Sequence, residues 1–295
     1  MSDVWLNGNF IDEANASISI RDTGLLHGIG VFTTMRASNG AVQRIGEHLR
    51  RLRDSCEALF IPLLPKDSAI EAAATELLQR NNCPDARLRL TVTRGTTQND
   101  PVHGLRVEPT TLLTAGALEP YPQELYEKGM TVVALDEQKL NPYDIQAGHK
   151  TLDYFSRLTA LREANRRGAN EALWFNVHNY LQSGSISNVF LVKNGELHTP
   201  PTAVELRDKE VAAATPYPKS NVLPGITRAV VLEAAEAKNV AVRLRGLSIN
   251  DLLDADEVFL TNSVMGVMPV CRIERRVIGN EKPGRLTRVF AEAVR

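Results

Sequence analysis

The stretch Gly148-His149-Lys150-Thr151-Leu152-Asp153-Tyr154 places a lysine just before residues 152–166, whose apolar spacing predicts an amphipathic helix. Spacing alone favours a plain interpretation, because most lysines at the first turn of a helix are solvated. A functional role for Lys150 therefore has to be inferred from other segments of the chain.

Three other loops combine small, polar residues with an adjoining helix or strand. Each is modest evidence by itself. A turn before a strand is common, and nearly every helix begins with free N–H groups that can receive a phosphate. A polar turn after a strand can cradle an anion or can be only a turn. The three loops are residues 184–190 (GSISNVF), 223–228 (LPGITR) and 261–264 (TNSV).

The composition is that of an ordinary globular protein and excludes several classes of function. The chain has 295 residues, 43% hydrophobic and 23% charged, and a formal net charge of −1. It therefore lacks a broad basic surface for nucleic acid or an anionic membrane. No apolar run is long enough to span a bilayer, and the first residues, MSDVWLNGNF, do not resemble a signal peptide.

Cysteine and histidine form no metal-binding or disulfide pattern. The three cysteines are scattered and odd in number, and the six histidines are dispersed. No HExxH, Walker or GxSxG motif occurs. We therefore expect no metal site and a reducing, cytoplasmic setting.

Both halves of the chain mix strands with helices, which predicts a two-domain α/β or α+β protein. Alternation predicts strands over residues 17–22 (SISIRD) and 87–93 (RLRLTVT), the second with a partly basic face. Apolar spacing predicts helices over residues 47–59 and 68–80.

A domain boundary is expected at residues 119–122 (EPYP), where two prolines punctuate the chain. We expect an N-terminal α/β domain over residues 1–118, a linker over 119–125 and a C-terminal domain over 126–295.

Taken in order, the four loops and their flanking segments resemble the class IV aminotransferases, which are fold type IV enzymes of pyridoxal 5'-phosphate (PLP). The family includes branched-chain aminotransferases, D-amino acid aminotransferases and aminodeoxychorismate lyases. The similarity covers essentially the whole chain, and the ordered set is far more specific than any one segment. It runs through WLNGNFID, RDTGLLHGIGVFTTMR, RIGEHLRRLRDSCEAL, RLRLTVTRG, GHKTLDY, NEALWFN, GSISNVFLVKNGELHTP, VLPGITR and DADEVFLTNSVMGVMPV.

The resemblance implies the D-amino acid aminotransferase-like fold, a C-terminal PLP-binding domain and specific roles for single residues. Lys150 matches the lysine that forms the Schiff base with PLP, a role that requires a primary amine. Once released, the same amine can move the α-proton of the substrate. Tyr154 lies near the position of a tyrosine that contacts the ring hydroxyl in some members, although its spacing from the lysine differs by one from the branched-chain enzymes.

The cofactor phosphate is expected to be held by an arginine and by backbone amides. Arg51, in EHLRRL, matches the arginine that binds the phosphate, and its planar fork suits that group. Ile226 and Thr227 match the amides at a helix N-terminus, and Ser263 and Val264 match the second set of phosphate donors.

One position departs from the family pattern. Nearly all members have a glutamate where this chain has Ser183, in LQSGSISN, and that glutamate keeps the pyridine nitrogen of PLP protonated. A protonated ring is a strong electron sink. A serine hydroxyl can only hydrogen-bond the nitrogen. Either the enzyme runs a reaction that needs a weaker sink, or it has lost much of its activity. Gln182 is adjacent but should point to the other face of a strand.

The substrate-facing segments do not agree on one member of the family. Residues 32–36 (FTTMR) and 262–270 (NSVMGVMPV) are more similar to aminodeoxychorismate lyases, whereas HKTLDY is more similar to aminotransferases. The arginine and histidine clamp of the D-amino acid enzymes is missing after Arg94. The resemblance implies Phe32, Thr34 and Arg94 as substrate-facing candidates.

Two activities are therefore expected with about equal weight. In the first, Lys150 removes a proton and pyruvate leaves aminodeoxychorismate to give 4-aminobenzoate, a step of folate synthesis. In the second, an amino group moves between an amino acid, branched-chain or other, and a 2-oxo acid. Ser183 favours the elimination slightly, and a catalytically impaired PLP-binding protein is the third alternative. The family resemblance also implies a homodimer.

Overall fold

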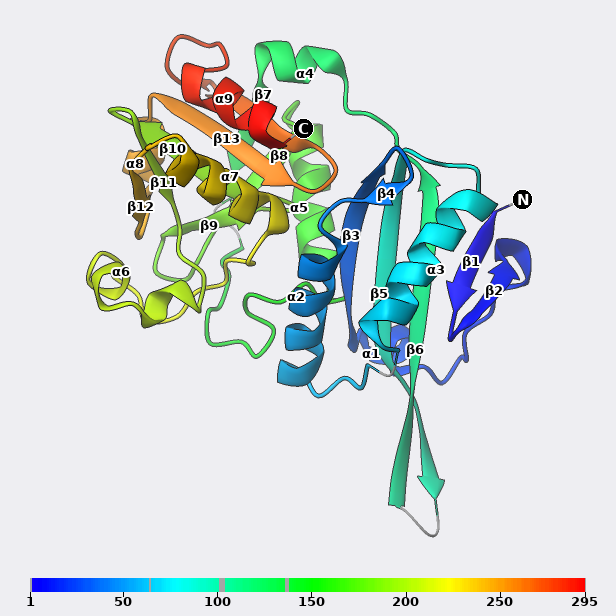
Figure 1. Cartoon of the computed structure of the whole chain (residues 1–295). Coiled ribbons are helices and arrows are strands. Elements are labelled where there is room, and N and C mark those ends of the chain that lie inside the picture. Colours follow the sequence, from blue (N-terminus) through cyan, green and yellow to red (C-terminus); the bar gives the residue numbers. More distant parts are fainter. Residues whose placement is uncertain (1, 64, 101–103, 136–137, 295) are drawn as a thin grey trace. The chain divides into compact units, whose positions relative to one another are not determined.

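The computed structural model describes residues 2–63, 65–100, 104–135 and 138–294, and the chain forms two compact units (Figure 1). The first unit comprises Met1–Glu119 and His149–Tyr154, and the second comprises Pro120–Gly148 and Phe155–Arg295. The short return of His149–Tyr154 to the first unit has no counterpart in the expected boundaries, and a helix, α4 (Gln123–Lys128), begins inside the expected linker of residues 119–125.

The first unit is built on a six-stranded antiparallel sheet in the order β2-β1-β6-β5-β3-β4. Two helices, α2 and α3, pack on one face of this sheet (Figure 1). The elements in chain order are β1 (Asp3–Leu6), β2 (Asn9–Asp12), η1 (Glu13–Asn15), α1 (Thr23–His27), β3 (Gly30–Ser38), β4 (Ala41–Val42), α2 (Ile45–Ala58), α3 (Asp67–Arg80), β5 (Ala86–Asp100) and β6 (Gly104–Ala117).

The core of the first unit follows from the apolar periodicity. Alternate residues of β5, including Leu88 and Leu90, point to the same face of the sheet, and both are fully buried. The matching stripes of α2 and α3, including Leu49 and Leu77, cover them. The helices expected over residues 47–59 and 68–80 are thus present with ends that shift by one or two residues.

The strand expected over residues 17–22 is wrong. Ile18 and Ile20 lie in an irregular segment with exposures of 50% and 80%. The segment is fastened by Asp22, whose buried carboxylate accepts from the Gly24 amide at the start of α1 and from the hydroxyl of Thr93 at 2.8 Å. An alternating pattern needs a neighbouring strand to pair with, and this segment is fixed by side-chain hydrogen bonds instead.

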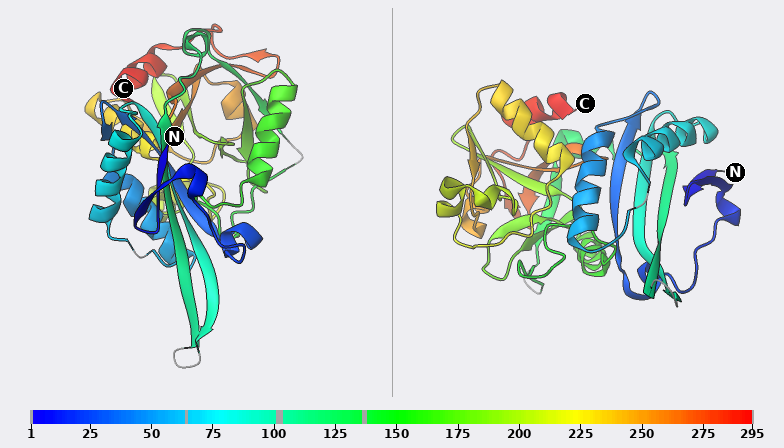
Figure 2. Two further views of the ribbon diagram at one scale, coloured as in Figure 1. Left: turned by 90° about the vertical axis from the view of Figure 1, so that its right-hand side faces the viewer. Right: turned by 60° about the horizontal axis from the view of Figure 1, so that its bottom comes forward.

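The hairpin of β5 and β6 extends well past the other strands of its sheet (Figure 2, left). Its register shifts between Thr93 and Thr96, at Gly95, which has a φ of +72°. A Cβ at Gly95 would lie 1.7 Å from the Glu108 carbonyl oxygen, so only glycine fits this bulge.

The second unit is built on a nine-stranded mixed sheet, in the order β12-β11-β10-β13-β14-β7-β8-β9 with β15 paired to β14. Its elements after α4 are β7 (Met130–Ala134), α5 (Phe155–Arg166), β8 (Glu171–Phe175), β9 (Leu181–Gly184), β10 (Asn188–Lys193), β11 (Glu196–Thr199), η2 (Glu205–Arg207), α6 (Lys209–Ala213), α7 (Ile226–Ala237), β12 (Val242–Leu244), α8 (Ile249–Leu253), β13 (Glu257–Asn262), β14 (Gly266–Ile273), β15 (Arg276–Val277) and α9 (Arg285–Val294).

Helices cover this second sheet in two groups. The helices α7 and α9 bury Val231 and Phe290 against Phe190 and Phe259 of the sheet. The helix α5 buries Ala160 and other small residues against β7 and β8. No helix within the described ranges has the length and apolar character needed to cross a bilayer.

Candidate functional site

The backbone around Lys150 is fixed to the first unit on both sides. The Phe32 amide donates to the Lys150 carbonyl, and the Leu152 amide donates to the Gly30 carbonyl, each at 2.9 Å. The imidazole of His149, the preceding residue, contacts the Ser55 hydroxyl of α2 at 2.9 Å. These contacts hold Lys150 at the start of β3 although it lies far away in sequence.

Gly30 permits this close pairing. A Cβ at this position would lie 2.5 Å from the Leu152 side chain and 2.8 Å from the Val92 carbonyl oxygen. The two strands and the lysine segment therefore approach one another only because residue 30 has no side chain.

The side chain of Lys150 is half-buried among aromatic rings. Its Nζ donates to the Tyr154 hydroxyl at 3.0 Å and lies 4.6 Å from the centre of the Phe32 ring. Phe32 and Tyr154 meet edge to face, with ring centres 5.4 Å apart. Thus the structure brings together Lys150, Tyr154 and Phe32, which were singled out from the sequence.

Arg51 lies in the same unit and is held by a buried polar chain. Its Nη2 donates to the Thr33 hydroxyl at 3.0 Å, and that hydroxyl contacts His48 Nδ1 at 2.7 Å. Burial, together with the Arg51 and Lys150 charges, lowers the pKa of His48 to about 3. The imidazole is therefore neutral near pH 7. The Thr33 oxygen accepts from the guanidinium, and its hydroxyl proton is available for Nδ1 of the neutral ring.

Burial also lowers the pKa of Arg51, to about 10, and Tyr154 partly opposes this shift. The guanidinium remains charged near pH 7. It is therefore a fixed, partly desolvated cation, which is suited to a phosphate.

Two more arginines lie near the candidate substrate residues. The guanidinium of Arg89 stacks 3.7 Å from the centre of the Phe32 ring, and Arg89 pairs with Thr34 across β3 and β5. Burial is the main cause that lowers the pKa of Arg89. Arg94 donates through its backbone to Ile29, while its buried Nε has no hydrogen-bond partner among the described residues.

In the second unit, Ser183 lies in β9 opposite Trp174 of β8 and is 5% exposed. A bulge at Gln182 separates this pair from the next one. The Gln182 amide turns elsewhere, donating to the Tyr217 hydroxyl and accepting from the Asn221 amide, both at 3.1 Å. The side chain that does reach Ser183 is Arg157 of α5, whose Nη1 donates to the Ser183 hydroxyl at 3.3 Å.

The loop after Ser183 is held by a buried glutamate. Glu171 is 3% exposed and accepts from the backbone amides of Ser185 and Ile186, at 3.0 and 3.3 Å, and from the Ser187 hydroxyl at 3.2 Å. Burial raises the pKa of Glu171, and these hydrogen bonds oppose the shift. The carboxyl group of Glu171 thus fixes the loop through these hydrogen bonds.

The helix α7 begins without a side-chain cap, so no side chain of the described chain caps the amides at its first turn. Its N-cap is Gly225, where a Cβ would lie 2.0 Å from Asn188 Oδ1. Asn188 in turn donates to the Leu223 carbonyl at 2.9 Å. The amides of Ile226 and Thr227 therefore open onto a tightly shaped turn that suits an anion.

The turn after β13 is organised by Asn262. Its Oδ1 accepts from the amides of Val264 and Met265, at 2.9 and 2.8 Å. The Val264 amide is therefore already engaged inside the turn, and its expected role as a phosphate donor remains a prediction, as does that of Ser263.

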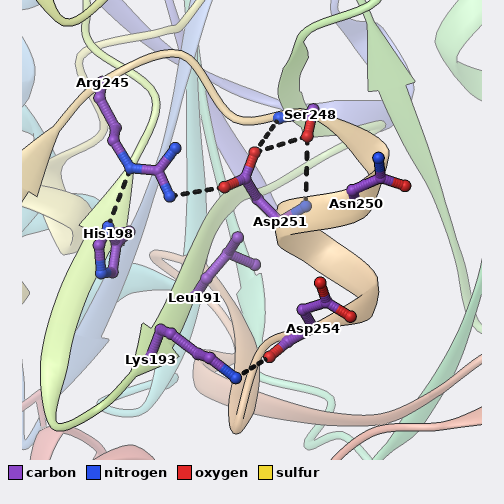
Figure 3. Close-up of a pocket in the computed structure, with 8 residues that line it drawn as sticks. All are labelled: Leu191, Lys193, His198, Arg245, Ser248, Asn250, Asp251 and Asp254. Atoms are coloured by element: carbon purple, nitrogen blue, oxygen red, sulfur yellow. Dashed lines mark hydrogen bonds and ion pairs between the residues drawn. The ribbon is translucent and has the colours of Figure 1, made fainter.

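A polar pocket of about 240 Å³ lies elsewhere in the second unit (Figure 3). Its charged groups satisfy one another: Arg245 binds Asp251 at 2.7 Å and contacts His198 Nδ1 at 3.2 Å, while Lys193 donates to the Asp254 carbonyl. The pocket contains none of the residues singled out from the sequence. Within the described part of the chain, no three His, Cys, Asp or Glu side chains gather as a metal site.

Each unit, taken by itself, has groups that suit PLP. In the first unit a half-buried primary amine beside two aromatic rings can bind an aldehyde, and a fixed arginine can bind a phosphate. In the second unit the uncapped start of α7 can bind a phosphate. Sequence reasoning missed Thr33, His48, Arg89, Arg157 and Glu171, because each acts through a partner distant in sequence.

Comparison with known proteins places these features in a family context. The family model described as "Amino-transferase class IV" matches residues 30–273. A protein of Methanocaldococcus jannaschii with a provisional branched-chain-amino-acid aminotransferase name is 34% identical over 290 residues, covering 98% of this chain and 94% of that protein. The D-alanine aminotransferase of Bacillus licheniformis is 26% identical and covers 97% of this chain and 93% of its own length.

Solved structures agree on the fold. The branched-chain aminotransferase of Escherichia coli matches with a TM-score of 0.86 and 26% identity over 98% of this chain and 92% of its own. Another branched-chain aminotransferase, solved with pyridoxamine 5'-phosphate, also matches with a TM-score of 0.86, at 24% identity over 99% of this chain and 92% of its own. A 4-amino-4-deoxychorismate lyase candidate of Legionella pneumophila matches less well, with a TM-score of 0.76 and 24% identity over 90% of this chain and 91% of its own.

Proposed function

Because the chain belongs to the class IV aminotransferases, a family of PLP enzymes, we propose that it moves an amino group between a branched-chain amino acid and a 2-oxo acid. The lyase activity, which the sequence motifs favoured slightly, has weaker support. Relatives that are similar in sequence have aminotransferase names, whereas the lyase match is one of fold alone. The observation that carries the proposal is Lys150, which is fixed at the start of β3 and lies among Phe32 and Tyr154.

We assign each residue a part in this reaction. PLP supplies the electron sink for bond cleavage beside the amino carbon when it is bound. Lys150 would hold the cofactor through its primary amine and, when free, would move a proton, while Tyr154 positions its Nζ. Arg51 holds the phosphate, and the Thr33 hydroxyl holds Arg51.

Further phosphate donors are proposed in the second unit, at Ile226, Thr227, Ser263 and Val264. The uncapped start of α7 supports the first two. Arg89, which stacks on Phe32, is a cation suited to a carboxylate of the substrate.

The proposal is tested by the visible absorption spectrum of the purified protein with PLP. We expect a band of the lysine-bound cofactor in the wild type, and no such band in Lys150→Ala or in Lys150→Arg, which keeps the charge but cannot form the imine. A band that persists in Lys150→Arg would refute the role of Lys150.

Product analysis separates transfer from elimination. With a branched-chain amino acid and no 2-oxo acid, transfer stops after about one product per protein, because the amino group stays on the cofactor. Repeated release of pyruvate and 4-aminobenzoate from aminodeoxychorismate would instead establish the lyase, and a protein that binds PLP but does neither would be the impaired member.

We also propose a homodimer in the cytoplasm. Four large apolar side chains of the first unit are exposed close together in sequence: Ile18, Ile20, Leu25 and Leu26. Such a patch fits a second copy of the chain. The three cysteines are free and buried, as suits a reducing compartment. A single-chain mass in size-exclusion chromatography with light scattering would contradict the dimer.

A further inference from the structure

Arg157 reaches from α5 to the turn that carries Ser183. Its Nη1 donates to the Ser183 hydroxyl at 3.3 Å and to the carbonyl oxygens of Gly184 and Ser185, at 3.1 and 3.2 Å. Its guanidinium lies 5.6 Å from the centre of the Trp174 ring. Because three acceptors on one turn share the same nitrogen, the position of the guanidinium relative to Ser183 is well defined.

This contact decides what Ser183 can offer to a ligand. The guanidinium has only donors, so the Ser183 oxygen must accept from it. The hydroxyl proton and one oxygen lone pair of Ser183 then remain for a third group. Because a positive charge lies beside the hydroxyl, this position favours a ligand atom that accepts a hydrogen bond, whereas a carboxylate would favour a protonated one.

The carboxyl group of Glu171 fastens the same turn through groups other than the Ser183 hydroxyl. Glu171 accepts from the amides of Ala172, Ser185 and Ile186 and from the Ser187 hydroxyl. Its hydrogen bonds thus go to the residues around Ser183, and the charged side chain that hydrogen-bonds the Ser183 hydroxyl itself is Arg157.

We propose that Arg157 and Ser183 together form a donor pair that keeps the ring nitrogen of PLP unprotonated. The inference rests on the proposed function and on the family resemblance, which implies that Ser183 occupies the position of the residue that faces this nitrogen. An unprotonated nitrogen accepts the Ser183 hydroxyl proton in a hydrogen bond, whereas a protonated nitrogen would place a second positive charge near that of Arg157. Arg157 acts through Ser183 and is a positioning residue.

The physical cause is mainly electrostatic. A guanidinium stays charged at all working pH values. A like charge a few ångströms away disfavours a protonated pyridine nitrogen, by about 1–3 pKa units for close groups in proteins. The cofactor is then a weaker electron sink, and proton transfer by Lys150 carries more of the catalysis.

The experiment is ¹⁵N NMR of the holoenzyme loaded with PLP that carries ¹⁵N in the ring, recorded between about pH 5.5 and pH 8. Protonated and unprotonated pyridine nitrogens differ clearly in chemical shift, so the readout does not depend on activity. We expect the unprotonated signal across this range in the wild type. A protonated signal near pH 7 would overturn the proposal without any variant being made.

Variants then test Arg157 itself. In Arg157→Gln the pH at which the nitrogen becomes protonated should rise by about 1–3 units, whereas Arg157→Lys should stay close to the wild type. Arg166→Gln, an exposed arginine on the same helix, is the matched control and should not shift it. An unshifted Arg157→Gln would show that Arg157 only holds the turn, and would overturn its assigned role.

A double variant separates the two residues. Ser183→Glu alone introduces a carboxylate beside Arg157, which pairs with it and limits its effect on the ring. We expect a fully protonated nitrogen near pH 7 only when Ser183→Glu is combined with Arg157→Gln. Full protonation in Ser183→Glu alone would contradict the coupling. If the visible band of lysine-bound PLP is missing from the wild type, the proposed function has failed rather than this inference.

Discussion

The neutral state of His48 gives a pH dependence of stability that can be worked out in advance. His48 is 2% exposed, and its pKa is lowered from 6.5 to about 3. Between these two values the unfolded chain binds a proton that the folded protein excludes. The stability that this histidine contributes is therefore fully present above pH 6.5 and is lost as the pH falls toward 3.

The magnitude follows from the size of the shift. Each pH unit in this interval costs about 1.4 kcal/mol, so lowering the pH from about 7.5 to about 5.0 should remove about 2 kcal/mol of unfolding free energy through His48 alone. His48→Asn removes the titration but keeps an acceptor for the Thr33 hydroxyl, because an asparagine Oδ1 can take the place of the ring Nδ1.

The assay is urea unfolding of PLP-free protein, followed by circular dichroism at several pH values. The difference in unfolding free energy between wild type and His48→Asn should shrink by about 2 kcal/mol as the pH falls across this range. His27→Asn, the same substitution at an exposed histidine of the same unit, is the matched control. A wild type to His48→Asn difference that is constant with pH would refute the reasoning.

Three further substitutions test the supports of the site. Glu171→Gln turns a side-chain amide donor toward the Ile186 amide and should lower the unfolding free energy by about 1–3 kcal/mol, measured by urea unfolding; an unchanged midpoint would count against it. Gly30→Ala should press on Leu152 and reduce the PLP bound per protein, measured from the visible band, and full occupancy would contradict the close packing. Arg228→Met breaks the ion pair of buried Arg228 with Glu205, which anchors α7, and should cost about 3–5 kcal/mol in the same unfolding assay; an unfolding free energy equal to that of the wild type would refute this role.

The elements that the sequence predicts well are those whose signals are local. The apolar stripes of α2 and α3 and the alternation at the start of β5 are visible within about fifteen residues, and their positions agree with the structure to within a few residues. The segment at residues 17–22 shows the limit. Its alternation is also local, but a strand requires a partner, and the buried Asp22 fixes the chain in another way.

The site residues also differ in whether their signals are local in the sequence. Lys150 is identified by its ordered motif, and its contact with Tyr154 is four residues away in the chain. The role of His48 depends on the packing of β3 against α2. Only this packing brings the Thr33 hydroxyl into contact with both His48 and Arg51. Single-residue patterns do not contain such contacts, because they arise from strand register and helix packing.

Ser183 is the clearest case of a residue whose chemistry lies in its neighbour. In the sequence, Ser183 stands where the family pattern has a glutamate. The absence of that carboxylate suggests either an elimination reaction or lost activity. In the structure the register of β8 and β9 sets Ser183 opposite Trp174, and α5 places Arg157 within hydrogen-bond distance. The cation beside this hydroxyl favours Ser183 as a donor to an unprotonated acceptor. In our proposal, serine in place of glutamate therefore changes how the ring nitrogen is held, which is compatible with aminotransferase chemistry in which Lys150 does more of the proton transfer.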